Sequence, residues 1–256
     1  MAKILYGLAG EGMGHATRSK VVIDHLIQKG HSIHIVASNR AYDFLSGNKA
    51  TKIPGLKLVY ENNTVDKLKS IWINMKPKEG QESVEIVRKI ILEEQPDLII
   101  TDYEPTVAHL AGLMSWDAIT GKKKIPLISI DNMHVISNCK IEVLKKYYED
   151  YMIVKYGNDM IVPPQNVKKF IITTFFYPEV GRKNTILVPS LVRDKIVKAK
   201  TGQEDYLLVY QTSQSNTAMF DILKSFEREK FVIYGFNIQK KEKNLIFKKF
   251  SEDGFI

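Results

Sequence analysis

Residues 4–19, ILYGLAGEGMGHATRS, decide the fold class of this 256-residue chain. A short apolar run is followed by glycines at positions 7, 10, 12 and 14, then by His15, where the apolar spacing of a helix begins. Glycines between a strand and a helix let the backbone approach a ligand closely and leave the first N–H groups of the helix open. The stretch therefore predicts a strand, a ligand-binding turn and a helix.

Two nucleotide-binding motifs do not fit this turn. Walker A requires Gly-Lys-Ser or Gly-Lys-Thr after its four-residue spacer, and Met13 follows Gly12 here. The dinucleotide fingerprint requires Gly or Ala three residues after its second glycine. That position is His15 or Thr17, depending on the starting glycine. The turn is thus distinguished by its histidine.

Composition describes an ordinary folded protein, with 44% hydrophobic and 26% charged residues. The single cysteine excludes a disulfide framework and a cysteine zinc cluster, and it favours the cytoplasm. The first apolar run, about seven residues, is too short for a signal peptide, and no run approaches the roughly 18 apolar residues of a membrane span. We expect a cytoplasmic protein whose membrane contact would be peripheral, at the inner membrane face.

The net charge of +8 calls for an anionic partner or a lysine-rich solvated surface. Nucleic acid, an anionic membrane face and a phosphorylated substrate are the candidate partners. The basic residues are scattered, with groups at 122–124, 168–169 and 240–249. They are not interleaved with aromatic residues as in a nucleic-acid platform, so we expect no nucleic-acid partner.

Strand and helix patterns alternate along the first half of the chain. This alternation predicts an α/β fold with a parallel sheet covered by helices on both faces. The predicted strands are 4–8, 31–38, 56–60, 97–102 and 125–131, and the predicted helices are 17–29, 41–45, 82–94 and 106–114.

The later pattern is weaker and predicts a second domain. After a helix at 141–151 and strands at 170–174 and 185–188, a connection at 189–202 leads to a new strand, loop, helix and strand over 206–234. We predict a first domain at 1–190 and the start of a second at 203–256. About fifty residues are too few to close a doubly wound domain, so we expect the second domain to be incomplete in this chain.

Polar residues follow the predicted parallel strands, where α/β sheets bind ligands. His15 is the natural general base, because imidazole titrates near neutrality. A carboxylate would orient it, and Asp102 is the first choice, with Asp131 and Glu104 behind it. Purely structural roles remain open: His15 could cap the turn, and Asp102 could be the N-cap of the following helix. Arg18, in the first turn of the predicted helix, could contact an anionic ligand.

With these residues in place, the chain resembles the GT-B glycosyltransferases, closest to the branch related to peptidoglycan GlcNAc transferases and glycosyltransferase family 28. The resemblance implies two Rossmann-like, doubly wound domains facing a cleft, with the acceptor in the first and a nucleotide-diphospho sugar in the second. The segments on which the resemblance rests are residues 10–19, 96–105, 125–132, 207–210, 231–235 and 250–255.

The resemblance also implies roles for individual residues. His15 would deprotonate the acceptor hydroxyl and Asp102 would hold His15, in an inverting reaction without metal or cofactor. Residues implied at the acceptor side are Gly12, Met13, Gly14, Arg18, Glu104, Asp131 and Asn132, and those implied at the donor diphosphate are Thr212, Ser213 and Ser215.

Further expectations follow from the resemblance. The basic charge would suit a lipid-linked acceptor and a role in the cell envelope. The remaining donor-binding residues of the family would come after residue 256, so we expect a truncated enzyme or one that has lost activity. Three alternatives stay open: a nucleotide-sugar 2-epimerase with the same fold, a non-catalytic carbohydrate- or nucleotide-binding module, and an NADP-dependent oxidoreductase, which Arg40 would permit.

Overall fold

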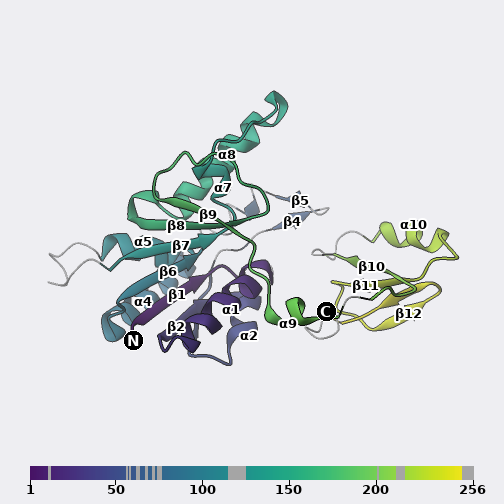
Figure 1. Cartoon of the computed structure of the whole chain (residues 1–256), viewed down its shortest axis with the longest axis horizontal. Coiled ribbons are helices and arrows are strands. Elements are labelled where there is room, and N and C mark those ends of the chain that lie inside the picture. The colour runs from purple at the N-terminus through teal and green to yellow at the C-terminus, as the bar shows by residue number, and fades with distance from the viewer. Residues whose placement is uncertain are drawn as a thin grey trace. The chain divides into compact units, whose positions relative to one another are not determined.

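The computed structural model divides by its internal contacts into two compact units (Figure 1). The first unit comprises Met1–Lys57 and Asn74–Val192, and the second comprises Leu58–Ile73 and Arg193–Ile256. Each unit has its own β-sheet, parallel in the first unit and mixed in the second. The structure describes the chain except residues 11, 12, 56, 58, 62, 63, 67, 68, 71, 72, 74–76, 115–124, 201, 212–216 and 250–256.

The first unit is built on a seven-stranded sheet in the order β3-β2-β1-β6-β7-β8-β9, in which every described pair of neighbours is parallel. The chain leaves β1 toward β2 and β3 and then crosses to β6 on the other side of β1. Such a reversal is the topological switch point at which open α/β sheets bind ligands. The strands are β1 (Lys3–Leu8), β2 (Ser32–Ala37), β3 (Ala50–Lys52), β6 (Leu98–Asp102), β7 (Leu127–Asp131), β8 (Val167–Thr174) and β9 (Thr185–Pro189).

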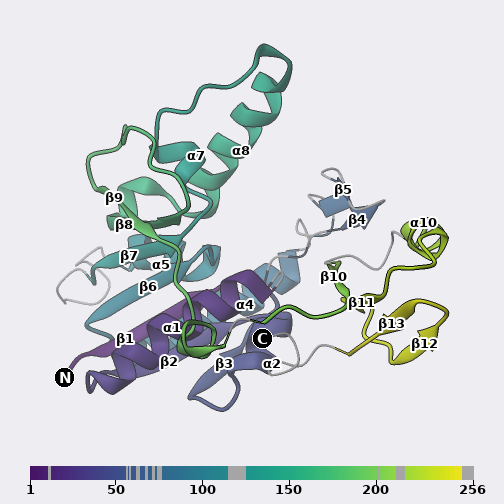
Figure 2. The ribbon, with the colours of Figure 1, turned by 45° about the vertical axis from the view of Figure 1, so that its right-hand side comes forward.

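Helices cover both faces of this sheet, as the turned view in Figure 2 also shows. Alternation along β1 divides the core, because successive side chains of a strand point to opposite faces. Leu5 packs with Val87 and Val107 on one face, whereas Tyr6 packs with Ile23 on the other. The helices are α1 (Met13–Gln28), α2 (Asn39–Leu45), α4 (Pro77–Glu94), α5 (Pro105–Leu113), α7 (Val135–Asn138) and α8 (Tyr148–Ile161), with short 3₁₀ turns η1 (Lys145–Tyr147) and η2 (Pro164–Asn166).

The second unit contains a four-stranded sheet in the order β10-β11-β13-β12. β10, β11 and β13 are parallel, and β12 pairs antiparallel with β13. Its small core is made of buried Phe231, Ile233, Leu245 and Phe247. Its described elements are β4 (Tyr60–Glu61), β5 (Thr64–Val65), α9 (Asp194–Lys198), β10 (Leu207–Tyr210), α10 (Met219–Ser225), β11 (Phe231–Tyr234), β12 (Lys240–Glu242) and β13 (Leu245–Phe247).

The predicted α/β class, with a parallel sheet between helices, is confirmed, but two elements differ from prediction. The third strand of the sheet is β3 at Ala50–Lys52, because pairing with β2 selects this short segment despite its lack of an apolar pattern. Of the strand predicted at 56–60, residues 56 and 58 lie outside the described residues, and Tyr60 belongs to β4. The helix predicted at 141–151 begins later and runs to Ile161, because Leu144 is extended and two acidic residues favour the first turn of α8. Within the described residues, no helix is long and apolar enough to cross a bilayer.

Candidate active site at the end of the central strands

The glycine-rich turn needs glycine at one described position for packing. A Cβ atom at Gly10 would overlap the backbone oxygen and the hydroxyl of Ser38, at the end of β2. At Gly14, in the first turn of α1, an added Cβ would meet nothing within 4 Å. Gly10 is therefore required for its close approach to Ser38, whereas Gly14 has no steric need to be glycine. Gly12 lies outside the described residues.

His15 and Asp102 meet beside the switch point. α1 carries His15 in its first turn and β6 ends at Asp102, so the Nδ1 atom of His15 lies 2.7 Å from Oδ1 of Asp102. Asp102 is fully buried, and the His15 side chain is 17% exposed. An ionised carboxylate only accepts hydrogen bonds, so Nδ1 of His15 donates to Asp102, and in the neutral imidazole the lone pair is then on Nε2. Nε2 has no hydrogen-bond partner among the described residues, which is the arrangement of a general base.

Asp102 is held by three further hydrogen bonds. The Arg18 guanidinium is bidentate, with Nη2 2.6 Å from Oδ1 and Nε 3.0 Å from Oδ2, and the Ser19 hydroxyl donates to Oδ2 at 2.9 Å. Burial alone would lower the pKa of Arg18, but the adjacent Asp102 carboxylate raises it above its ordinary value. The buried carboxylate is therefore compensated by a permanent cation and fixed in orientation.

Arg18 also connects this cluster to the end of β7. Its Nη1 donates to Oδ1 of Asn132 at 3.2 Å. The structure thus brings together four of the residues predicted for the site: His15, Asp102, Arg18 and Asn132. Nη2 of Arg18 also lies 3.1 Å from Nδ1 of His15, so the guanidinium contacts His15, Asp102 and Asn132 together. Met13 and Gly14 lie beside His15 at the start of α1.

Asp131 forms a second histidine–aspartate pair, with His134. Its Oδ2 accepts hydrogen bonds from Nδ1 of His134 at 2.8 Å and from the Ser129 hydroxyl at 2.6 Å, and its Oδ1 accepts one from the His134 backbone at 2.9 Å. Burial would raise the pKa of Asp131, but the His134 imidazole and these hydrogen bonds lower it to about 2. Asp131 is therefore engaged with His134 rather than with His15.

Glu104 is turned toward the backbone of α5. It is the N-cap of this helix, and its carboxylate accepts hydrogen bonds from the backbone N–H groups of Thr106 (3.1 Å) and Val107 (2.6 Å). Its side chain is buried, and this burial raises the pKa of Glu104. The capping role that the sequence allows for Asp102 is thus performed by Glu104. Among the described residues, no hydrogen bond or ion pair joins Glu104 to His15.

Tyr103, which the sequence patterns do not single out, lies between the two histidine–aspartate pairs. Its ring centroid is 6.0 Å from that of His15, nearly parallel at 15°, and 5.9 Å from that of His134. Its hydroxyl donates to Oδ1 of Asn158 in α8 at 2.7 Å. Its position between two candidate acidic residues at a strand end is the one signal that could have marked it. Thr212, Ser213 and Ser215 lie outside the described residues.

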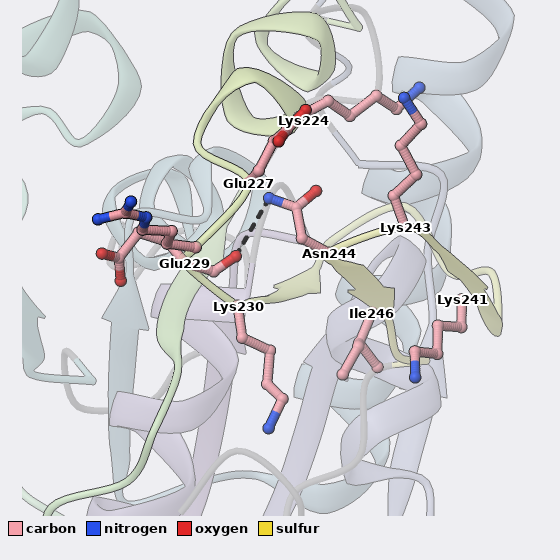
Figure 3. Close-up of a pocket in the computed structure, with 9 residues that line it drawn as sticks. Lys224, Glu227, Glu229, Lys230, Lys241, Lys243, Asn244 and Ile246 are labelled. Atoms are coloured by element: carbon pink, nitrogen blue, oxygen red, sulfur yellow. Dashed lines mark hydrogen bonds between the residues drawn. The ribbon is translucent and has the colours of Figure 1, made fainter.

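The described pockets lie elsewhere. One, of about 490 Å³, opens in the second unit at the amino ends of β11 and β13, and Figure 3 shows its lining. The ammonium groups of Lys230 and Lys241 point away from those of Lys224 and Lys243 in this view, so these cations do not converge on one point. Another, of about 660 Å³, lies at the amino ends of β6, β7 and β8, at the edge of the sheet opposite His15.

The fold is that of the GT-B class: a doubly wound α/β unit with a histidine–aspartate pair at its switch point, followed by a second, mixed sheet. The family model of glycosyl transferase family 1 matches residues 2–256, and the chain belongs to this family. The predicted membership of the GT-B glycosyltransferases is confirmed.

Solved structures share the fold at low sequence identity. The glycosyltransferase of kitacinnamycin aligns with 98% of this chain and 71% of its own, with a TM-score of 0.62 and 11% identity. The UDP-GlcNAc 2-epimerase of Neisseria meningitidis, solved with UDP-GlcNAc, aligns with 98% of this chain and 73% of its own, with a TM-score of 0.55 and 11% identity.

A curated relative covers only part of the chain. L-arabinokinase of Arabidopsis thaliana is 27% identical over 121 residues, which are 41% of this chain and 11% of that protein. The matched part is thus a small fraction of the relative.

Proposed function

We propose that this protein is an inverting glycosyltransferase that moves a hexosyl-type sugar from a nucleotide-diphospho donor to a hydroxyl acceptor. Membership of glycosyl transferase family 1 supports the class of reaction. One observation supports the site: Nδ1 of His15 is held by buried Asp102, 2.7 Å away, while Nε2 has no partner among the described residues. In this arrangement a neutral imidazole offers Nε2 as the atom that accepts a proton.

In the proposed reaction, Nε2 of His15 takes the proton of the acceptor hydroxyl as its oxygen attacks the anomeric carbon. The bond from that carbon to the donor phosphate oxygen breaks, and the nucleoside diphosphate leaves with the bonding electrons. Attack opposite the leaving group inverts the anomeric centre. Asp102 stays ionised and stabilises the imidazolium, a form of general-base catalysis worth about 10² to 10⁴ in rate.

The donor and acceptor sites are also proposals. We assign the donor diphosphate to Thr212, Ser213 and Ser215, whose hydroxyls, with backbone N–H groups, would bind the leaving group without metal or cofactor. A net charge of +8 supports an anionic or lipid-linked acceptor at the cytoplasmic membrane face and a role in the cell envelope.

A second candidate is a nucleotide-sugar 2-epimerase, because the N. meningitidis epimerase shares the fold over 98% of this chain. The two candidates differ in what happens to the donor. A transferase releases nucleoside diphosphate only as sugar moves to an acceptor, whereas an epimerase inverts carbon 2 of the nucleotide sugar without an acceptor.

A donor screen tests the proposal and separates the two candidates. The protein is incubated with UDP-, dTDP- and GDP-hexoses in the presence of extracted lipid and soluble acceptors, and nucleoside diphosphate and sugar products are quantified. We expect one donor to yield nucleoside diphosphate and glycosylated acceptor in equal amounts. Acceptor-independent epimerisation would favour the second candidate. Saturable NADP(H) binding without nucleotide-sugar binding or turnover would contradict both.

A further inference from the structure

Three consecutive residues at the end of β6 have separate tasks. Asp102 binds His15, Tyr103 stacks on His15, and Glu104 caps α5. In an extended strand, neighbouring side chains point to opposite faces, so Asp102 and Tyr103 should not reach the same partner. The backbone of Tyr103 is left-handed, with φ of 61°. This conformation breaks the alternation at Tyr103, where the side chain joins that of Asp102 at His15.

The ring of Tyr103 is fixed at its far end. Its hydroxyl donates to Oδ1 of Asn158 at 2.7 Å, and Asn158 is almost fully buried in α8. The Nδ2 atom of Asn158 donates in turn to the backbone oxygen of Met133 at 2.8 Å. A tethered hydroxyl and a constrained backbone leave the ring little freedom.

His134 is a second ring in contact with Tyr103. It packs edge-on against Tyr103, with an interplanar angle of 67°, and its own Nδ1 is held by Asp131. His134 is completely buried, and its Nε2 has no hydrogen-bond partner among the described residues. This second histidine is thus placed to pack rather than to exchange protons with a substrate.

A left-handed backbone at a non-glycine residue is uncommon and strained. Tyrosine has no polar side-chain atom close enough to its own backbone to offset that strain, unlike asparagine or aspartate. The left-handed conformation places the Tyr103 ring against His15 and His134 and its hydroxyl within hydrogen-bond distance of Asn158. Strain retained beside a candidate catalytic group points to a function for the strained residue.

We propose that Tyr103 is a positioning residue for His15. Its ring sets the plane of the imidazole so that Nδ1 stays on Asp102 and Nε2 stays available to the acceptor, and the Asp131–His134 pair backs the ring. The proposal rests on the proposed role of His15 as the base.

The test uses two ring-deleting variants and one conservative variant of the full chain. Tyr103→Asn and Tyr103→Gly both tolerate a positive φ, so their backbone strain is no greater than that of tyrosine. Tyr103→Phe keeps the ring and loses only the tether to Asn158. Tyr156→Asn, at a tyrosine of α8 that is 60% exposed, is the matched control.

Two measurements distinguish a misplaced His15 imidazole from a general loss of folding. Nitrogen-15 NMR of the imidazole reports whether His15 carries its proton on Nδ1, without any substrate. Steady-state kinetics with the donor found by the screen report kcat and KM. We expect the ring-deleting variants to lose the single Nδ1–H tautomer and to lower kcat by about tenfold to a hundredfold, as misplacement of a reacting group does, with KM within about threefold. Tyr103→Phe and Tyr156→Asn should stay near the parent protein.

The outcomes distinguish this inference from the proposed function. A folded ring-deleting variant that keeps both the Nδ1–H tautomer and kcat overturns the positioning role, even if His15 is the base. Loss of the tautomer with unchanged turnover supports the positioning role and contradicts the assignment of His15 as base. If neither ring-deleting variant folds, Tyr103→Leu decides, because it keeps an apolar side chain without the ring: loss of the Nδ1–H tautomer with a lower kcat supports the role of the ring, and retention of the tautomer with kcat within about threefold overturns it.

Discussion

The Nδ1 atom of His15 lies 2.7 Å from Oδ1 of Asp102, although 87 positions separate the two residues along the chain. Their meeting follows from the order of the sheet, in which β1 is paired directly with β6. His15 stands at the start of the helix after β1, and Asp102 is the last residue of β6. The crossover at the switch point therefore assembles a histidine–aspartate pair at one edge of the sheet.

Asp102→Asn should impair catalysis and stability together. Asparagine keeps the shape but lacks the charge that stabilises the imidazolium, so kcat should fall by about 10² to 10⁴. It also leaves the buried Arg18 without its counter-ion, which costs about 3 kcal/mol of unfolding free energy. Transfer kinetics and urea unfolding measure the two effects. If the pair acts as a unit, His15→Ala combined with Asp102→Asn should be no slower than the slower single variant; multiplied effects would speak against it.

Alanine at Gly10 should lower the unfolding free energy, whereas alanine at Gly14 should raise it. Gly10→Ala places a Cβ on the Ser38 backbone, so the turn must shift, and we expect a loss of about 2 kcal/mol or more in unfolding free energy. Gly14→Ala adds a methyl group to open space in α1 and should stabilise by about 0.5 to 1 kcal/mol. Urea unfolding compares the two variants. Equal destabilisation by both would show that the close packing at Gly10 is not what the turn requires.

Glu104→Ala tests whether Glu104 caps α5 or binds the acceptor. Loss of the N-cap of α5 should cost about 1 kcal/mol of unfolding free energy. Because the carboxylate is turned to the backbone of Thr106 and Val107, the KM for the acceptor should not change. Thermal unfolding and acceptor titrations test this prediction. A large rise in acceptor KM without loss of stability would restore the acceptor-binding role.

Asp131 should make stability depend on pH in the acid range. Its pKa in the folded protein is about 2, against an ordinary value of 3.8. A lowered pKa stabilises the fold above the ordinary value, and this contribution, roughly 2 kcal/mol, is lost as the pH falls from about 4 through about 2. Between about pH 5.5 and about pH 3, the parent protein should lose about 1 kcal/mol more unfolding free energy than Asp131→Asn. Identical losses in urea unfolding would refute the assignment.

The sequence predicts the parallel sheet well because its central strands are apolar and its helices amphipathic. β3 escapes prediction, since Ala-Thr-Lys has no apolar pattern and becomes a strand only by pairing with β2. The β12–β13 hairpin is similarly weak in sequence, because charged residues occupy all of β12. Long-range pairing, which local pattern does not encode, defines both.

The site is predictable in part. Strand ends identify His15 and Asp102 as neighbours, because carboxyl ends of parallel strands gather at one edge. Which carboxylate caps α5 is not visible in the sequence, since Asp102 and Glu104 both precede the helix. In the structure Asp102 binds His15 and Glu104 caps α5, and the left-handed backbone of Tyr103 lies between these two carboxylates.

The most direct test of the central claim compares two histidines of the same helix. His15→Ala and His25→Ala are assayed for sugar transfer with the donor and acceptor found by the screen, with unfolding measured in parallel; His25 is exposed on α1 and serves as the control. We predict that His15→Ala lowers kcat by about 10² to 10⁴ and that His25→Ala stays near the parent protein. Transfer that persists unchanged in a folded His15→Ala variant would contradict the account.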